Sequence, residues 1–374
     1  MPLEKTTMIF DYQTRLNKLR RSVSRRRLDG LLISCRENIY YLSGFTGDDS
    51  RLLVTSARAI LITDFRFRQQ AEETLAPGCE LRIRTSKSLN NESAAVCRDL
   101  SLKKIGFEES HLSYDDFTHL KKYLRGRELR PAGSPVESLR MIKDPEEISL
   151  LRESARLSVR VLERAVGGIR FGMTEADLSG RIIISSLKTG GTPAFSPIVA
   201  AGDKSSRPHA VPGPRSLNSG MILLVDMGVG AKAYMSDMTR TFVLEEYPRR
   251  FKTIYRAVLG AQETAIRFIR PGVKAAEVDG EARRYLEEKG YGRYFGHSLG
   301  HGVGLEVHER PVISSRSRDV IKEGMVFTVE PGVYIPGWGG IRIEDTVLVT
   351  KDGCEILTEY PKALDLMMIR NLQR

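Results

Sequence analysis

Histidine is the commonest protein ligand for metal ions and the usual acid–base group near neutral pH. This sequence of 374 residues has six histidines, and three of them lie in one glycine-rich segment, GHSLGHGVGLEVHERP, at residues 296–311. They are His297, His301 and His308, and a fourth, His209, lies in the segment SSRPHA. The cluster indicates either a metal-binding or catalytic segment or a loop whose histidines only form hydrogen bonds. The histidines alone do not separate these two interpretations.

Four acidic residues lie in stretches that otherwise have the apolar character of buried strands. They form two pairs, each centred on an expected turn, at residues 231–232 and at Gly337. The pairs are Asp226 with Asp237 and Glu330 with Glu344. If each turn sits at its centre, the two acids face each other across an antiparallel ladder, with Cβ atoms about 4.5–5.5 Å apart. Carboxylates held so close on an apolar sheet repel each other and lose solvation, so we expect a cation between them. A surface position is the alternative for any single one of these acids.

The donor atoms indicate which cation. Four carboxylates and one imidazole without thiolates argue against a structural zinc site. An oxygen-rich site suits manganese, cobalt, iron or zinc in a catalytic role. Because five ligands are too many for one catalytic ion, we expect two divalent ions, manganese first, sharing carboxylates and acting together on a water and a carbonyl.

Side-chain alternation in the strands supports a polar cleft. In IRIED, Arg342 and Glu344 share one face, while the neighbouring isoleucines share the other. In SDMTRTF, Asp237, Thr239 and Thr241 point one way, away from Met238, Arg240 and Phe242. We therefore expect a sheet that lines the site with its polar face.

The elements that position these residues occur twice. IRFGMTEAD begins at Ile169 and IRPGVKAAEVD begins at Ile269, and each lies between two helical stretches. A histidine-bearing segment and an apolar strand pair follow in both cases. The agreement of four features in the same order favours an internal duplication over a chance similarity of two short strings.

The first part of the chain has the pattern of a small α/β domain. Short apolar runs such as LLIS, RLLVT and AILIT have the length and bounding turn residues of buried strands. The segment RPAGSP is a plausible linker. We therefore predict an α/β (α+β) protein with domains at residues 1–133 and 134–374.

Composition excludes some classes of function. The net charge is +11, but the basic runs look like solvated helix faces without aromatic or zinc-finger patterns, so we expect no nucleic-acid partner. No apolar run approaches the roughly 20 residues that span a bilayer, and no signal peptide is apparent, so we expect no membrane association. Four cysteines without ligand or disulfide spacing favour a cytoplasmic location.

Five strings between about residues 145 and 360 carry a family resemblance: PHA, LLVDMGVGAKAYMSDMTRTF, GHSLGHGVGLEVHERP, GMVFTVEPGVY and GGIRIED. With them the sequence resembles the metallopeptidase family that contains methionine aminopeptidase, aminopeptidase P and prolidase. The resemblance implies the pita-bread fold, which is an internally duplicated α/β structure, and a site for two divalent metal ions. The ligands that it implies, called the ligand set below, are Asp226, Asp237, His301, Glu330 and Glu344.

The resemblance also implies roles for these residues. Asp237 and Glu344 would bridge the two ions, while Asp226 would bind one ion. His301 and Glu330 would bind the other, with Glu330 also acting as the general base. The roles of three further histidines follow in the same way: His209 and His308 contact the substrate and assist the tetrahedral intermediate, and His297 supports the site.

The first domain resembles the creatinase/prolidase N-terminal domain through NIYYLSGFTGDDSRLLVT, LITDFRF and KKIGFEES. Methionine aminopeptidases generally lack this domain, so the resemblance implies a hydrolase of Xaa-Pro bonds. It further implies that Phe195 and Ile198 line an apolar substrate pocket, with core packing as the alternative, and that the protein is a homodimer. Arg342 would orient Glu344 or bind a substrate carboxylate.

We therefore predict a dinuclear metallo-exopeptidase that cleaves Xaa-Pro dipeptides or longer Xaa-Pro peptides. Prolidase-type relatives often have an arginine directly after the HE-x-P motif, where this chain has Val312, which weakens the dipeptidase interpretation. Arg310 and Arg342 are the candidates to replace that arginine. A creatinase-like amidinohydrolase and a non-enzymatic binding protein on the same fold are the alternatives.

Overall fold

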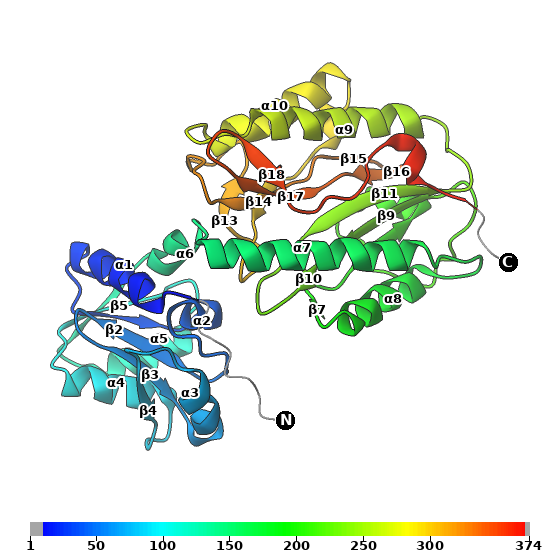
Figure 1. Cartoon of the computed structure of the whole chain (residues 1–374). Helices are drawn as coiled ribbons and strands as arrows, with labels where there is room; N and C mark the ends of the chain where they lie inside the picture. The colour runs from blue at the N-terminus through cyan, green and yellow to red at the C-terminus, as the bar shows by residue number, and fades with distance from the viewer. Residues whose placement is uncertain (1–9, 371–374) are drawn as a thin grey trace. The chain divides into compact units, whose positions relative to one another are not determined.

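The structure, a computed structural model, describes residues 10–370 and contains two compact units (Figure 1). One unit ends at Arg140 and the other begins at Met141. The expected boundary lies earlier, between residues 133 and 134. The difference comes from helix α6 (Pro135–Arg140), which packs on α1 (Tyr12–Arg25) and α2 (Arg36–Ser43) and so belongs to the first unit.

The first unit is built on a six-stranded mixed sheet with strand order β4-β3-β2-β1-β5-β6. The predicted apolar runs form its centre, because every residue of β1 (Gly30–Ile33) and β3 (Ala59–Thr63) is buried. Helices α4 (Leu89–Asp99) and α5 (Tyr114–Tyr123) supply apolar residues to the core on one face of the sheet. The remaining elements are β2 (Arg51–Thr55), α3 (Arg68–Thr74), β4 (Glu80–Ile83), β5 (Lys104–Phe107) and β6 (Glu128–Pro131).

The second unit repeats one arrangement twice, as the sequence predicts. In each half two helices precede an antiparallel strand pair, and in Figure 1 the two helix pairs flank the strands from opposite sides. The first half has α7 (Pro145–Val166), α8 (Glu175–Lys188), β7 (Thr192–Pro193), β8 (Ile198–Ala201), β9 (Ile222–Met227), β10 (Val229–Gly230) and β11 (Met238–Leu244). The second half has α9 (Phe251–Phe268), α10 (Ala275–Glu288), β12 (Gly300–Gly302), β13 (Glu309–Ile313), β14 (Val326–Val329), β15 (Gly332–Ile335), β16 (Gly339–Arg342), β17 (Asp345–Val349), β18 (Cys354–Ile356) and β19 (Met368–Ile369).

Two sheets hold the site. One has the order β19-β11-β9-β8 and the other β13-β12-β14-β17-β18, while β10 pairs with β7 and β15 with β16. Helix α7 begins as its sequence predicts: Asp144 caps it and Glu147 completes a capping box, so both orphan N–H groups are satisfied. One continuous apolar core joins both halves.

The register of the second hairpin agrees with the prediction. Val329 pairs with Asp345 in the β14–β17 ladder, and Gly332 pairs with Arg342 in the β15–β16 ladder. Both ladders therefore share one register, which places Glu330 opposite Glu344 in the gap between them.

The register predicted for the first hairpin is wrong. Asp226 pairs with Thr239 rather than with Asp237. The turn consists of Lys232 and Ala233, which have φ values of 49° and 70°, and it lies one residue later than expected. A shift of the centre by one residue moves every cross-strand partner by two, which removes the direct opposition of the two aspartates.

No helix among residues 10–370 is both long and apolar enough to cross a membrane. The four cysteines, Cys35, Cys79, Cys97 and Cys354, are all free.

Candidate metal centre

Three members of the ligand set lie together. One donor atom each from Asp237, His301 and Glu344 falls within 4.8 Å of the others. These residues come from the start of β11, from β12 and from the junction of β16 with β17, so the two halves of the fold both contribute. One imidazole nitrogen and two carboxylate oxygens form a donor group that suits a divalent ion of the first transition row.

The imidazole of His301 is held in one orientation. Its Nδ1 lies 3.2 Å from the carbonyl oxygen of Gly302, an acceptor that fixes the proton on Nδ1. Its Nε2 then faces carboxylates, 3.6 Å from Oδ2 of Asp237 and 3.4 Å from Oε1 of Glu330. Burial lowers the pKa of His301 to about 4, so the ring is neutral at pH 7, as a metal ligand must be.

Asp226 joins the site through Arg342. The Nη2 of Arg342 donates to Oδ2 of Asp226 at 2.5 Å. Both side chains are largely buried, with 4% of Arg342 and 11% of Asp226 exposed. The Nη1 of the same guanidinium donates to the hydroxyl of Tyr334 at 2.9 Å. Although burial lowers the pKa of Arg342, the surrounding anions raise it well above its usual range, so the side chain stays charged.

Thr239 links Arg342 to a second member of the ligand set. The Nε of Arg342 donates to Oγ1 of Thr239 at 3.0 Å, and that hydroxyl donates to Oε2 of Glu344 at 2.5 Å. One oxygen of Glu344 is therefore oriented by a hydrogen bond, as ligating carboxylates commonly are.

Three carboxyl groups of the ligand set lie so close together, and so far from water, that their charged forms are disfavoured. Burial, reinforced by the neighbouring acids, raises the pKa of Asp237 and of Glu344 well above the usual range. Burial raises the pKa of Glu330 to about 8. A bound divalent cation would be the largest local charge and would keep these groups ionised at neutral pH.

Two buried carboxylate oxygens of the ligand set have lone pairs that a metal ion could take up. No residue within 10–370 donates a hydrogen bond to Oδ1 of Asp226 or to Oδ1 of Asp237. An unsatisfied buried acceptor costs free energy unless another partner takes its place. Together with the clustered donor atoms, these two oxygens fit a site for divalent metal ions.

The non-ligand histidines lie around this centre. His209, in the loop after β8, and His308, just before β13, are both exposed. The ring centroid of His308 is 4.1 Å from that of His301. His297 is more enclosed, and its Nε2 lies 3.0 Å from the hydroxyl of Tyr334, which connects it to Arg342. This contact agrees with a supporting position for His297.

The two predicted apolar contacts lie at the start of β8 and three residues before it. Phe195 and Ile198 are half-buried, and Ile198 pairs with Asp226 across the β8–β9 ladder. The place of Ile198 opposite a member of the ligand set is consistent with a substrate pocket, and that role stays a prediction for both residues.

Sequence reasoning missed Tyr334. Its hydroxyl joins His297 and Arg342, and burial raises its pKa to about 12, so it remains protonated. Strand alternation could have found it, because Tyr334 is four residues after Glu330 and therefore on the same face of the hairpin.

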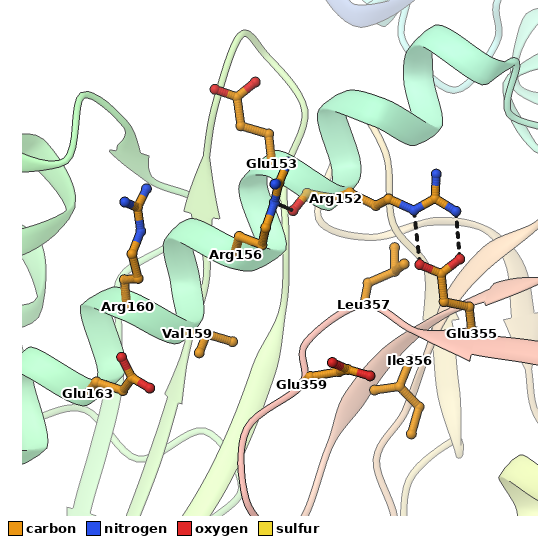
Figure 2. Close-up of a pocket in the computed structure, with 10 residues that line it drawn as sticks. All are labelled: Arg152, Glu153, Arg156, Val159, Arg160, Glu163, Glu355, Ile356, Leu357 and Glu359. Carbon is orange, nitrogen blue, oxygen red and sulfur yellow. Dashed lines mark hydrogen bonds and ion pairs between the residues drawn. The ribbon is translucent and has the colours of Figure 1, made fainter.

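A separate hollow of about 860 Å³ lies between α7 and the segment after β17, and none of the ligand set lines it. Figure 2 shows Arg152 of α7 reaching across to Glu355 of β18, with nitrogen–oxygen distances of 2.9 and 2.6 Å. Charged residues of both signs surround an apolar floor there, and this arrangement offers no evident chemistry.

Two family matches cover most of the chain. Residues 149–351 match metallopeptidase family M24, and residues 15–142 match the creatinase/prolidase N-terminal domain. The first match includes the whole ligand set.

Individual proteins agree with these matches. The chain is 34% identical to the Xaa-Pro dipeptidase of Pyrococcus horikoshii, over 94% of this chain and 98% of that protein. Among solved structures, it is similar to an Xaa-Pro dipeptidase from Bacillus anthracis, with a TM-score of 0.92, 37% identity and coverage of 96% and 100% of the two chains. It is also similar to an X-Pro aminopeptidase from Thermotoga maritima, with a TM-score of 0.84, 36% identity and coverage of 92% and 99%.

Proposed function

Because the chain belongs to metallopeptidase family M24, with a creatinase/prolidase N-terminal domain ahead of its peptidase domain, we propose that it hydrolyses the bond between an N-terminal residue and a following proline. The observation that carries this proposal is the meeting of Asp237, His301 and Glu344 within 4.8 Å. The names of the similar proteins from Pyrococcus, Bacillus and Thermotoga support the substrate class.

The ligand set is proposed to hold two divalent ions, manganese first, with cobalt, zinc or iron as alternatives. When bound, such ions lower the pKa of a shared water toward neutrality and polarise the scissile carbonyl. Asp237 and Glu344, from opposite halves of the fold, are the residues that would contribute to holding both ions.

The protein's own groups then move the protons. Glu330 lies 3.4 Å from Nε2 of His301 and accepts the proton of the attacking water as general base. His308 lies beside His301 with part of its surface exposed, and the partial enclosure of its ring lowers its pKa, so it is a neutral donor at pH 7. We propose that its N–H stabilises the oxyanion and that His209 contacts the substrate.

We propose that Arg342 orients ligands rather than substrate. It is 3% exposed, and its nitrogens donate to Asp226, Thr239 and Tyr334. Nη1 also lies 3.4 Å from the carbonyl oxygen of Pro208. A guanidinium with so many protein partners has little left for a dipeptide carboxylate.

A second candidate activity, release of the first residue from longer Xaa-Pro peptides, is favoured by the surroundings of Val312. Val312 is 43% exposed and pairs with His301 across the β12–β13 ladder, so an apolar side chain flanks the site where an arginine would grip a dipeptide. The nearby Arg310 donates to Asp319 at 2.5 Å.

The deciding experiment offers Ala-Pro and Ala-Pro-Ala in parallel to metal-stripped protein, with and without added manganese or cobalt. Metal-dependent cleavage of Ala-Pro alone identifies a dipeptidase, and release of alanine from the tripeptide alone identifies an aminopeptidase. The variant Val312→Arg should raise the ratio of dipeptide to tripeptide cleavage. If neither peptide is cut with metal restored, the peptidase proposal is wrong, and creatine becomes the next substrate to offer.

A homodimer and a cytoplasmic location stay predictions. Sedimentation equilibrium of the full chain tests the first, and fractionation of cells tests the second.

A further inference from the structure

A second buried ionic cluster lies behind the candidate metal centre, on the other face of β11 and β17. Its centre is Asp345, which is fully buried. Oδ1 of Asp345 accepts from Nη2 of Arg240 at 2.6 Å and from Oγ1 of Thr358 at 3.1 Å. Oδ2 accepts from Nε2 of Gln262 at 3.1 Å and from Nζ of Lys362 at 2.5 Å. One carboxylate therefore joins β11, β17, α9 and the chain after β18.

The donors of this cluster also reach the backbone beside the ligand set. Nη1 of Arg240 donates to the carbonyl oxygen of Thr239, at 2.9 Å, and to that of Glu344. Nε2 of Gln262 lies 3.3 Å from the carbonyl oxygen of Val329, the residue directly before Glu330. Two bonds of the cluster thus fix the main chain at or next to two glutamates of the ligand set.

A third connection leads to Asp237. The hydroxyl of Thr346 donates to the carbonyl oxygen of Asp237 at 2.7 Å. The N–H of Thr346 donates in turn to Oγ1 of Thr358 at 3.0 Å, and that hydroxyl donates to Asp345. The cluster therefore reaches the segments of Asp237, Glu330 and Glu344 from a single acceptor.

Such a cluster is a poor way to gain stability. Both members of the pair Arg240–Asp345 are 0% exposed, and the loss of hydration offsets most of the attraction between buried charges. Its hydrogen bonds are directional, however, and they connect strands that approach the site from different parts of the chain. Outer residues that orient metal ligands commonly change metal affinity when they are lost.

We propose that Asp345 is a positioning residue which, with Arg240 and Gln262, sets the spacing of the ligand-bearing strands and thereby the affinity for divalent ions. The proposal rests on the proposed function, because it assumes that the ligand set binds such ions. It assigns Asp345 no contact with substrate or metal.

Two substitutions separate positioning from general stability. Gln262→Leu and Lys362→Met each remove one donor from the same oxygen of Asp345. Lys362 also donates to Oε1 of Gln262 at 3.1 Å, but only Gln262 is bonded to the main chain beside the ligand set. We would titrate Mn²⁺ into metal-stripped full-length wild type and both variants by calorimetry, and record their thermal midpoints. Gln262→Leu should weaken Mn²⁺ binding by about 10-fold or more, whereas Lys362→Met should stay within about 3-fold of wild type.

Thr346→Val is the second arm, since it keeps the side-chain shape and removes the bond to Asp237. It should also weaken Mn²⁺ binding by about 10-fold, and it decides the question if Gln262→Leu does not fold. If Gln262→Leu and Thr346→Val, where folded, bind Mn²⁺ as tightly as Lys362→Met does, the positioning role is refuted. If wild type itself binds no Mn²⁺, the proposed function fails instead, which is a distinct result.

Discussion

The two hairpins that carry the acids of the site differ in how they align them. In the second half, the ladders on both sides of the gap share one register, and Glu330 faces Glu344 around the left-handed Gly337. In the first half, the turn at residues 232–233 places Thr239, not Asp237, opposite Asp226.

This difference gives the halves reciprocal support. Thr239 of the first hairpin donates to Glu344 of the second, while Arg342 of the second donates to Asp226 of the first. If the first hairpin had the register predicted from its centre, Asp237 instead of Thr239 would lie opposite Asp226. The hydrogen bonds that connect the two hairpins therefore depend on a difference in register between the two halves.

The largest expected effect comes from removing one acid of each hairpin. Asp237→Asn and Glu344→Gln should each lower kcat/KM by at least about 1,000-fold, because each removes a proposed bridging ligand from the two-ion site. Steady-state cleavage of the preferred peptide, with metal content measured on the same samples, checks this.

Glu355→Gln, on β18 and outside the ligand set, is the matched control and should retain activity. Near-normal turnover by Asp237→Asn would show that Asp237 is not an essential ligand and would leave Asp226 as the acid that the first hairpin contributes.

The cross-supports should have intermediate effects. Arg342→Met should weaken Mn²⁺ binding by about 10- to 100-fold and Thr239→Val by less, because these residues orient ligands without being ligands. Calorimetric titration of metal-stripped protein measures both. A variant of Arg342 that binds Mn²⁺ normally but shows a raised KM for dipeptides alone would assign that residue to the substrate instead.

Stability of the metal-free protein should fall as the pH rises from 7 to 8. Burial raises the pKa of Glu330 from 4.5 to about 8, so in this window the folded protein keeps a proton that the unfolded chain has released. Each retained proton contributes a slope of about 1.4 kcal/mol per pH unit. Burial lowers the pKa of His297 and of His301 from 6.5 to about 4, so the unfolded chain still protonates a minority of these rings near pH 7. They therefore offset part of the slope at the lower end of this window and little of it near pH 8.

Urea unfolding at several pH values, with and without Mn²⁺, measures this slope. Mn²⁺ should flatten it, and Glu330→Gln should flatten it more than Glu355→Gln, because the hydrogen bonds from Arg152 hold the pKa of Glu355 below its usual range. A slope that is identical in all four samples would contradict the assignment of these protons to the second hairpin.

The smallest effects concern the turns. Gly337, with φ 75°, has no atom within 4 Å of the place of a Cβ, so Gly337→Ala should cost about 1 kcal/mol through backbone strain alone. Ala233→Gly at φ 70° should instead stabilise by about 0.5 kcal/mol, since relief of strain exceeds the added entropy of the unfolded chain. Equal signs in chemical denaturation would show that the two turns are not held in the same backbone region.

Much of this architecture follows from the sequence. Alternation in IRIED separates Arg342 and Glu344 from the buried isoleucines, and the repeated helix pair and hairpin predict the duplication. The turn of the first hairpin could not be placed in this way. Glycine is the residue expected in a tight turn, so Gly230 favours a turn that is too early, whereas Lys232 and Ala233 adopt the left-handed backbone without glycine.

The supporting residues are harder to foresee. Gln262 interrupts an apolar helix face, which signals a buried polar contact, but its partners Val329 and Asp345 are 67 and 83 residues away. Only the packing of α9 against the strands brings them together, and no local pattern encodes that meeting.

The shared register of the second hairpin has a consequence for chain connectivity. The β14–β17 ladder is by itself sufficient to align Glu330 with Glu344. The covalent link through Gly337 is therefore not needed to hold these two residues in place. With this turn opened, the two ladders should retain the arrangement of the acids. Proteolytic nicking at the same point should likewise leave a two-fragment protein whose site is intact.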